Sequence, residues 1–178
     1  MLNNWKYEEI HEGDVFVWND PYLSEGGIGN LLNLCVCVPV FHHEDLVAFC
    51  IALGRHDDMA GMAYGGVSPT STEIFQEGVL VPPVRLYDRG AVNNAAFRII
   101  TRNNREPDRM RTDIDAAVTA CRLGGAKIVA LCDRFGKDAV LKSFEELMEK
   151  CAAYVREELL PKIPDGEYSW EDYIESDG

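Results

Sequence analysis

Three short stretches of the sequence combine side chains that could carry out chemistry. The first is Asn19-Asp20, which lies between Trp18 and Pro21. A carboxylate and an amide at the end of a strand, close to a glycine-rich loop, could hold a substrate. Asn-Asp-Pro is also a strong turn former, because short polar side chains hydrogen-bond to the backbone beside them. The residues alone leave both interpretations open.

The second stretch is His56-Asp57-Asp58, directly after Arg55. A histidine next to carboxylates can ligate a metal ion or serve as an acid and base. The same residue types are also ordinary content of surface loops. Catalysis or metal binding by His56 and Asp58 is therefore a hypothesis with a plain alternative.

The third feature is the pair Glu73 and Glu77. On a short helix, a spacing of four residues places both carboxylates on one face. They could face a site as catalytic groups, or they could pair with Arg85 or Arg89 for structural reasons.

Two common catalytic signatures are missing from the sequence. It contains no GxxxxGKS or GxxxxGKT phosphate loop, so this chain is not itself a P-loop ATPase. It contains no GxSxG nucleophile motif either. The hydroxyls of Ser68, Thr70, Ser71 and Thr72 have no identifiable base near them in the sequence.

The elements that must position these residues change in type near residue 90. Before it, the pattern predicts strands over residues 14–18, 31–41 and 46–53, with the last two forming an antiparallel hairpin. A glycine-rich loop over 54–71 follows, and a loop of that length in a compact domain is usually functional. Residues 81–87 are expected to be extended.

After residue 90 the pattern predicts helices over 91–101, from Pro107 to Gly136, and over 138–160. Their apolar stripes indicate core or interface packing. We expect an α+β fold: an antiparallel strand region (about 13–90), a helical region (about 91–161) and a C-terminal strand-like tail (162–178) that needs a partner sheet. Residues 1–178 would form a single partial domain.

Composition excludes several classes of partner. The 178 residues carry a net charge of -13, which argues against binding nucleic acid or an anionic membrane. Six cysteines without a CxxC spacing do not suggest a zinc knuckle. The N-terminus has no apolar signal segment, so a reducing cytoplasm is the simpler localisation.

Ordered motifs over nearly the whole chain resemble the hydantoinase B / 5-oxoprolinase family, to which the large subunits of acetone and acetophenone carboxylases are related. The matching segments are Gly13-Asp-Val-Phe-Val-Trp-Asn-Asp-Pro-Tyr22, Pro39-Val-Phe-His42, His56-Asp-Asp-Met-Ala-Gly61, Ser68-Pro-Thr-Ser-Thr-Glu-Ile-Phe-Gln-Glu-Gly78, Asn103-Asn-Arg-Glu-Pro107, Asp113-Ile-Asp-Ala116 and Asp133-Arg-Phe-Gly136.

The resemblance implies a component of an ATP-dependent amidohydrolase, acting on a hydantoin, lactam or oxoproline, or of a related ketone carboxylase. ATP and Mg would be bound by a hydantoinase A-type ATPase subunit, and the remaining B-type segments would complete a hetero-oligomer. Asp20, His56, Glu73 and Glu77 would be catalytic, and Asn19 and Asp58 would contact the substrate.

Two departures from the family pattern stand out. The chain corresponds to an internal segment of longer B-type chains. The resemblance also implies a divalent metal, but its ligand positions fall on Asn30, Asn33 and Arg55, leaving His56 and Asp58 as weak ligands. The alternative hypothesis is therefore a non-catalytic structural or assembly subunit with a degenerate metal site. On either hypothesis the isolated chain is not expected to be active.

Overall fold

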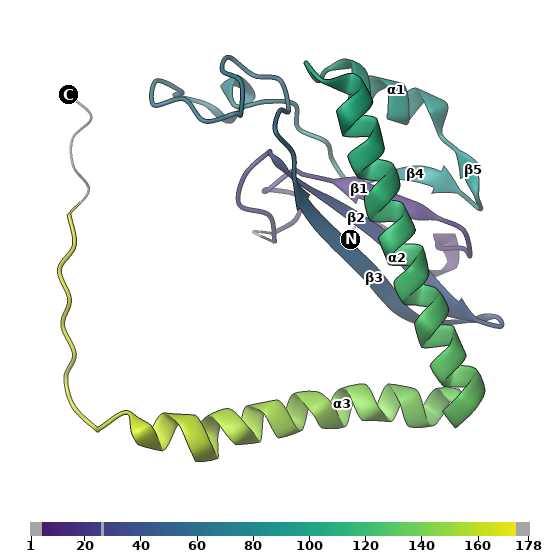
Figure 1. Ribbon diagram of the computed structural model, residues 1–178, viewed down its shortest axis with the longest axis vertical. Helices are drawn as coiled ribbons and strands as arrows, with labels where there is room; N and C mark the ends of the chain where they lie inside the picture. Colours follow the sequence, from purple (N-terminus) through teal and green to yellow (C-terminus); the bar gives the residue numbers. More distant parts are fainter. Residues whose placement is uncertain (1–4, 26, 174–178) are drawn as a thin grey trace. The chain divides into compact units, whose positions relative to one another are not determined.

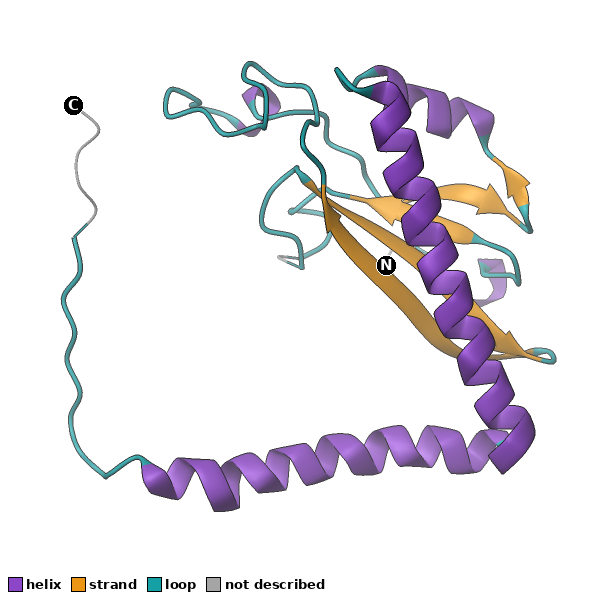
Figure 2. Ribbon diagram, in the orientation of Figure 1, coloured by secondary structure: helices purple, strands orange, loops and turns teal. Residues whose placement is uncertain are grey.

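The computed structural model describes residues 5–25 and 27–173, and the last five residues of the expected tail lie outside them. The chain divides into two compact units, Met1–Ala130 and Leu131–Gly178, each of which is described by itself. The first unit is an antiparallel sheet with helices, and the second is helical (Figures 1 and 2). The expected α+β fold, with strands followed by helices, is confirmed.

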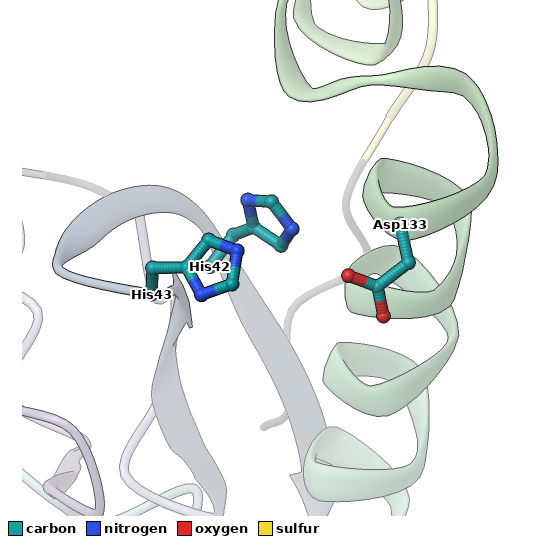
Figure 3. A group of neighbouring side chains, drawn as sticks. All are labelled: His42, His43 and Asp133. Atoms are coloured by element: carbon teal, nitrogen blue, oxygen red, sulfur yellow. The ribbon is translucent and has the colours of Figure 1, made fainter.

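The first unit is built on a five-stranded sheet in the order β3-β2-β1-β4-β5, with every neighbouring pair antiparallel. The strands are β1 (Val15–Trp18), β2 (Asn33–His42), β3 (Asp45–Arg55), β4 (Val84–Asp88) and β5 (Ala91–Val92). The hairpin of β2 and β3 is the longest pairing, from Asn33 opposite Arg55 to His42 opposite Asp45. At its tip the imidazoles of His42 and His43 lie side by side, with ring centroids 4.3 Å apart (Figure 3).

The two faces of the sheet follow from the alternation of side chains along a strand. In β1, Val15 and Val17 point to the face covered by helices, and Phe16 and Trp18 point to the other face. Because both faces of β1 and β2 are covered, these strands are apolar almost throughout. This explains why the sequence over 31–41 is apolar except at Asn33 and does not alternate.

The helices α1 (Asn94–Arg102) and α2 (Pro107–Phe135) supply the cover of one face (Figure 1). Helix α1 begins later than expected because β5 takes the first residues, and the Asn93 side chain then caps the helix by accepting a hydrogen bond from Ala96 N–H. The buried contacts with the sheet come from Phe97, Ile100, Met110, Ile114, Val118 and Cys121.

Two glycines on α2 allow the helix to approach the hairpin closely. A Cβ atom at Gly125 would lie 3.1 Å from a methyl carbon of Val40, and one at Gly124 would lie 3.3 Å from the Cys50 sulfur. The helix runs through both glycines without a break, so their effect is close packing rather than interruption.

The second unit contains the end of α2 and α3 (Lys137–Tyr154), followed by a π-helical turn (Val155–Leu159) and a short 3₁₀ turn (Leu160–Lys162). Gly136 separates the two helices at φ 87°, as expected of a helix-terminating glycine. The stripe expected to be the buried face of α3 differs from expectation. Val140 is buried, but Phe144, Leu147, Cys151, Tyr154 and Val155 are exposed. The described residues of this unit offer nothing to cover them.

The tail from Ile163 to Tyr173 forms no strand in the part of the chain that the structure describes. A strand needs a hydrogen-bonded neighbour, and no second strand is available within this unit. Among the described residues, no helix combines the length and apolar character needed to cross a membrane.

Candidate functional site

Asn19 is fully buried and fixes three backbone segments. Its side-chain amide donates to the carbonyl oxygens of Leu31 (2.8 Å) and Val79 (2.9 Å). Its Oδ1 accepts from the N–H of Val81 at 2.6 Å. These three hydrogen bonds hold the end of β1 to the segment before β2 and to the segment before β4.

Asp20 uses its carboxylate in a turn. Its Oδ1 accepts from the backbone N–H groups of Tyr22 (2.9 Å) and Leu23 (3.0 Å). This is the turn chemistry that the Asn-Asp-Pro sequence predicts as the alternative to substrate contact. A catalytic role of Asp20 and a substrate contact of Asn19 stay predictions.

Asp58 holds the loop after β3 to the start of α2. Its buried carboxylate accepts from the N–H groups of Ala60 (3.1 Å) and Arg105 (2.9 Å) and pairs with the Arg105 guanidinium at 2.5 Å. Burial alone would raise the pKa of Asp58, but the hydrogen bonds from Arg105 and Ala60 outweigh it and lower the pKa. Asp58 is therefore ionised, and both of its carboxylate oxygens already accept hydrogen bonds from other residues of the chain.

His56 is buried at the end of β3, where its backbone N–H donates to the Leu32 carbonyl oxygen at 2.8 Å. Its Nδ1 lies 3.5 Å from the Oδ2 of Asp113 on α2. Burial lowers the pKa of His56, and the nearby Asp113 carboxylate offsets only part of that effect. A neutral imidazole beside a carboxylate can accept a proton.

His56 and Asp113 line a cavity of about 340 Å³ between the end of the hairpin and α2, which we call the histidine cavity. Arg109 lines it as well and forms a 2.5 Å ion pair with Asp57. The cavity thus contains a buried imidazole between two carboxylates and a guanidinium.

The loop after β3 is held close to the segment before β4 by glycines. At Gly61 (φ 82°), a Cβ atom would lie 2.5 Å from the Glu77 carbonyl group. At Gly78 (φ 157°), it would lie 2.5 Å from the Met59 carbonyl oxygen. Backbone hydrogen bonds from Met62 to Gln76 (2.7 Å) and from Val79 to Met59 (2.8 Å) join the two segments.

Glu73 and Glu77 do not lie on one helix. Only a single 3₁₀ turn (Ile74–Gln76) lies between them, with Glu73 extended before it (φ -150°, ψ 152°). The two carboxylates therefore do not share a helix face, and the expected helical spacing is wrong. Neither pairs with Arg85 or Arg89: Arg85 lies by Asp14 and Asp88, and Arg89 contacts His11.

Glu77 instead reaches a second cavity of about 180 Å³, which we call the polar cavity. It is lined by Asn30, Leu31, Leu32, Arg55, Gly66, Val67, Ser68 and Glu77. Arg55 also lines the histidine cavity, so this residue borders both cavities. Asn33 lies opposite Arg55 in the hairpin register. The structure thus brings together three positions that the resemblance assigns to metal ligands.

The donor set of the polar cavity does not fit the divalent metal that the resemblance implies. One carboxylate and one neutral amide are weak ligands for a transition metal, and the guanidinium of Arg55 repels a cation. His56 and Asp58 are absent from the polar cavity lining, and Asp58 is already paired with Arg105. Metal binding by His56 and Asp58 stays a prediction.

Sequence reasoning missed three residues of this region: Arg105, Arg109 and Asp113. They lie on or before the first turns of α2 and meet the loop after β3 only in the folded chain. Motif segments that contain Arg105 and Asp113 are part of the family resemblance, so that pattern could have signalled them.

Comparisons with known proteins agree with the fold and the motifs. The family model described as Hydantoinase B/oxoprolinase matches residues 1–178. Caprolactamase subunit beta of Pseudomonas jessenii is 33% identical over 172 residues, which is 96% of this chain and 29% of the relative. Acetophenone carboxylase delta subunit of Aromatoleum aromaticum is 30% identical over 162 residues, 90% of this chain and 23% of the relative.

A solved structure gives the same result in three dimensions. The crystal structure of ATP-dependent caprolactamase from Pseudomonas jessenii superimposes with a TM-score of 0.77 at 28% identity, covering 89% of this chain and 27% of that one. The chain spans less than a third of the length of each of these relatives.

Proposed function

The chain belongs to the hydantoinase B/oxoprolinase family, and we propose that it is a component of an ATP-dependent amidohydrolase or a related ketone carboxylase. In that assembly it lines the substrate site. The matched relatives include subunits of a caprolactamase and of an acetophenone carboxylase, which supports a component of this kind. The reaction and the substrate belong to the proposal.

The observation that carries the proposal is the convergence of polar side chains at the end of the β2–β3 hairpin. Asn30, Arg55 and Glu77 come from three separate stretches of the chain and line one cavity. His56 and Asp113 line the cavity on the other side of Arg55. A cavity with a few convergent polar groups is the usual form of a small-molecule site.

His56 is the proposed general base of this site, with Asp113 as the group that orients it. The pKa of His56 is lowered by burial, so the imidazole is neutral and its ring can take a proton from water or from a substrate. Glu77 and Arg55 would bind the polar part of the substrate. Glu73 is exposed and does not line either cavity, so any role for it requires a partner chain or a loop movement.

ATP and Mg are proposed to bind a hydantoinase A-type ATPase subunit, because this sequence has no phosphate loop. Phosphorylation of the substrate's carbonyl oxygen turns a poor leaving group into a good one, or traps an enol. The remaining B-type segments would cover the apolar face of α3, where Leu147 and Met148 are 60% and 66% exposed.

A second candidate is a non-catalytic assembly subunit. It is supported by the residues at the positions to which the resemblance assigns metal ligands: Asn30, Asn33 and Arg55 have side chains that do not suit a divalent cation. On this proposal the chain keeps the fold and the contacts with its partners but leaves the chemistry to a complete B-type subunit.

Purification of the native assembly through a tag on this chain separates the two candidates. Subunit mass spectrometry and ATP hydrolysis with hydantoin, lactam and ketone substrates would be measured on the same material. We expect an A-type ATPase, the remaining B-type segments and substrate-stimulated ATP hydrolysis. A complete second B-type subunit with intact metal ligands would favour the assembly role, and isolation of the chain alone would contradict both proposals.

A further inference from the structure

The polar cavity is lined by two residues of opposite charge, Arg55 and Glu77. Within residues 5–25 and 27–173, neither the Arg55 guanidinium nor the Glu77 carboxylate forms a hydrogen bond or an ion pair. We propose that this cavity binds a small amino acid as a zwitterion, with its carboxylate on Arg55 and its ammonium group on Glu77.

The backbones of the two charged residues are positioned by the fold rather than by a contact between their side chains. Arg55 is the last residue of β3, where it lies opposite Asn33. Glu77 follows the 3₁₀ turn and is held by the close approach of Gly61 to its backbone. Arg55 and Glu77 form no ion pair with each other, so both charges are available to a ligand. A ligand with both charges can bind with little rearrangement.

Other classes of ligand match this cavity less well. A divalent cation is repelled by Arg55, and a dicarboxylate places a negative charge beside Glu77. A neutral ketone can accept from Arg55 but offers nothing to the carboxylate. A guanidinium binds a carboxylate through paired, charge-assisted hydrogen bonds, and a carboxylate binds an ammonium group in the same way.

The rest of the lining sets the size and shape of the ligand. A cavity of about 180 Å³ is below the usual range for drug-sized ligands, so the ligand is small. Leu31, Leu32 and Val67 provide an apolar wall suited to a short methylene chain between the two charged ends. Asn30 and Ser68 add neutral polar groups. A short ω-amino acid has this distribution of charge and hydrocarbon.

A zwitterionic ligand also fits the proposed function as a reaction product. Only this assignment as a product rests on the proposed function. Hydrolysis of a lactam forms a bond between a water oxygen and the carbonyl carbon, breaks the carbon–nitrogen bond and moves protons to the nitrogen. The product carries an amine and a carboxylate, which are both charged at neutral pH. The polar cavity would then hold the product of ring opening.

The test is calorimetric titration of the full chain with 4-aminobutyrate, compared with butyrate and butylamine as probes that carry one charge each. We expect binding of 4-aminobutyrate and at least about tenfold weaker binding of each single-charge probe, since each loses one charge-assisted contact. Arg55→Gln and Glu77→Gln should each weaken 4-aminobutyrate binding by a similar factor.

Arg98→Gln is the matched control, because Arg98 is exposed on α1 and lines neither cavity. It should leave the affinity unchanged, and thermal unfolding should confirm that all three variants are folded. Equal binding of butyrate and 4-aminobutyrate, saturable binding of Mn²⁺ displaced by 4-aminobutyrate, or no binding at all would each overturn the inference. The titration uses no ATP and no partner, so these failures are distinct from failure of the native assembly to hydrolyse ATP.

Discussion

The Nδ1 atom of His56 lies 3.5 Å from the Oδ2 atom of Asp113, which joins the end of β3 to the second turn of α2. His56 is only 7% exposed. Burial disfavours its charged form more strongly than Asp113 favours it, so the pKa of His56 is lowered. His56 is therefore a neutral imidazole that is buried where α2 packs against the β2–β3 hairpin.

The lowered pKa of His56 predicts a loss of stability in weak acid. The unfolded chain takes up a proton near the unperturbed value of about 6.5, before the folded chain does. The contribution of His56 to the free energy of unfolding is therefore fully present above about pH 6.5 and is lost as the pH falls through the folded-state pKa. We expect the free energy of unfolding in urea to decrease between neutral pH and about pH 5.

His56→Asn should flatten this pH dependence, whatever its effect on absolute stability. His43→Asn is the control, because His43 is exposed and its positive φ of 56° suits asparagine. Identical slopes for His56→Asn and the parent chain would show that His56 is not the titrating group.

The hydrogen bonds of Asp58 with Arg105 and Ala60 predict that neutralising Asp58 costs much more unfolding free energy than neutralising its neighbour Asp57. Asp58→Asn removes the charge of a fully buried carboxylate that accepts from Arg105 and Ala60, and should cost about 2 kcal/mol of unfolding free energy because these charge-assisted hydrogen bonds are weakened. Asp57→Asn should cost little, since the Asp57–Arg109 pair is exposed and screened by solvent. Chemical denaturation of both variants measures the difference. Equal losses of unfolding free energy would contradict the role of Asp58 in holding the loop after β3 to the start of α2.

Gly61 is expected to be intolerant of any side chain. Gly61→Ala places a Cβ atom 2.5 Å from the Glu77 backbone, so the loop must shift. Gly90→Ala is the matched control, because Gly90 has a similar φ of 86° but nothing within 4 Å of the position that a Cβ atom would occupy. The control should lose about 1 kcal/mol from backbone strain alone, and Gly61→Ala should lose clearly more. Similar melting temperatures for the two variants would rule out the close approach.

The isolated chain is expected to associate in solution. The exposed apolar face of α3 includes Leu147 and Met148, and exposed apolar surface of this extent marks an interface. Light scattering of the purified chain should give a mass above that of one copy, and Leu147→Glu with Met148→Glu should reduce it. A parent chain that is monomeric at all concentrations would argue against an interface there.

Sequence patterns predicted the strands and helices well because each depends on local periodicity. The apolar run over 31–41 became β2, and Pro107 begins α2 as expected. The boundaries of elements differ from the predicted ones where contacts between elements determine them. Ala91 and Val92 pair with β4, so α1 begins later than predicted. The strand-like tail found no partner in the described chain, which periodicity cannot reveal.

The site was less predictable because it depends on contacts between distant segments. Glu73 and Glu77 have helical spacing in the sequence, but Glu73 is extended and only a 3₁₀ turn (Ile74–Gln76) separates it from Glu77. The partners of Asp58 and His56 are Arg105 and Asp113, which are far away along the chain. Only the family motifs, which are spread over the whole chain, pointed to both sides of this site.

The central claim is that the polar cavity of this chain is part of the substrate site of an ATP-dependent enzyme. Substrate-stimulated ATP hydrolysis by the native assembly, with Glu77→Gln compared with Glu44→Gln on the exposed hairpin turn, tests it most directly. We predict that Glu77→Gln lowers the rate stimulated by a sub-saturating substrate by about tenfold, because one charge-assisted contact is lost, whereas Glu44→Gln leaves it unchanged. An assembly that retains full stimulated hydrolysis with Glu77→Gln would contradict the claim.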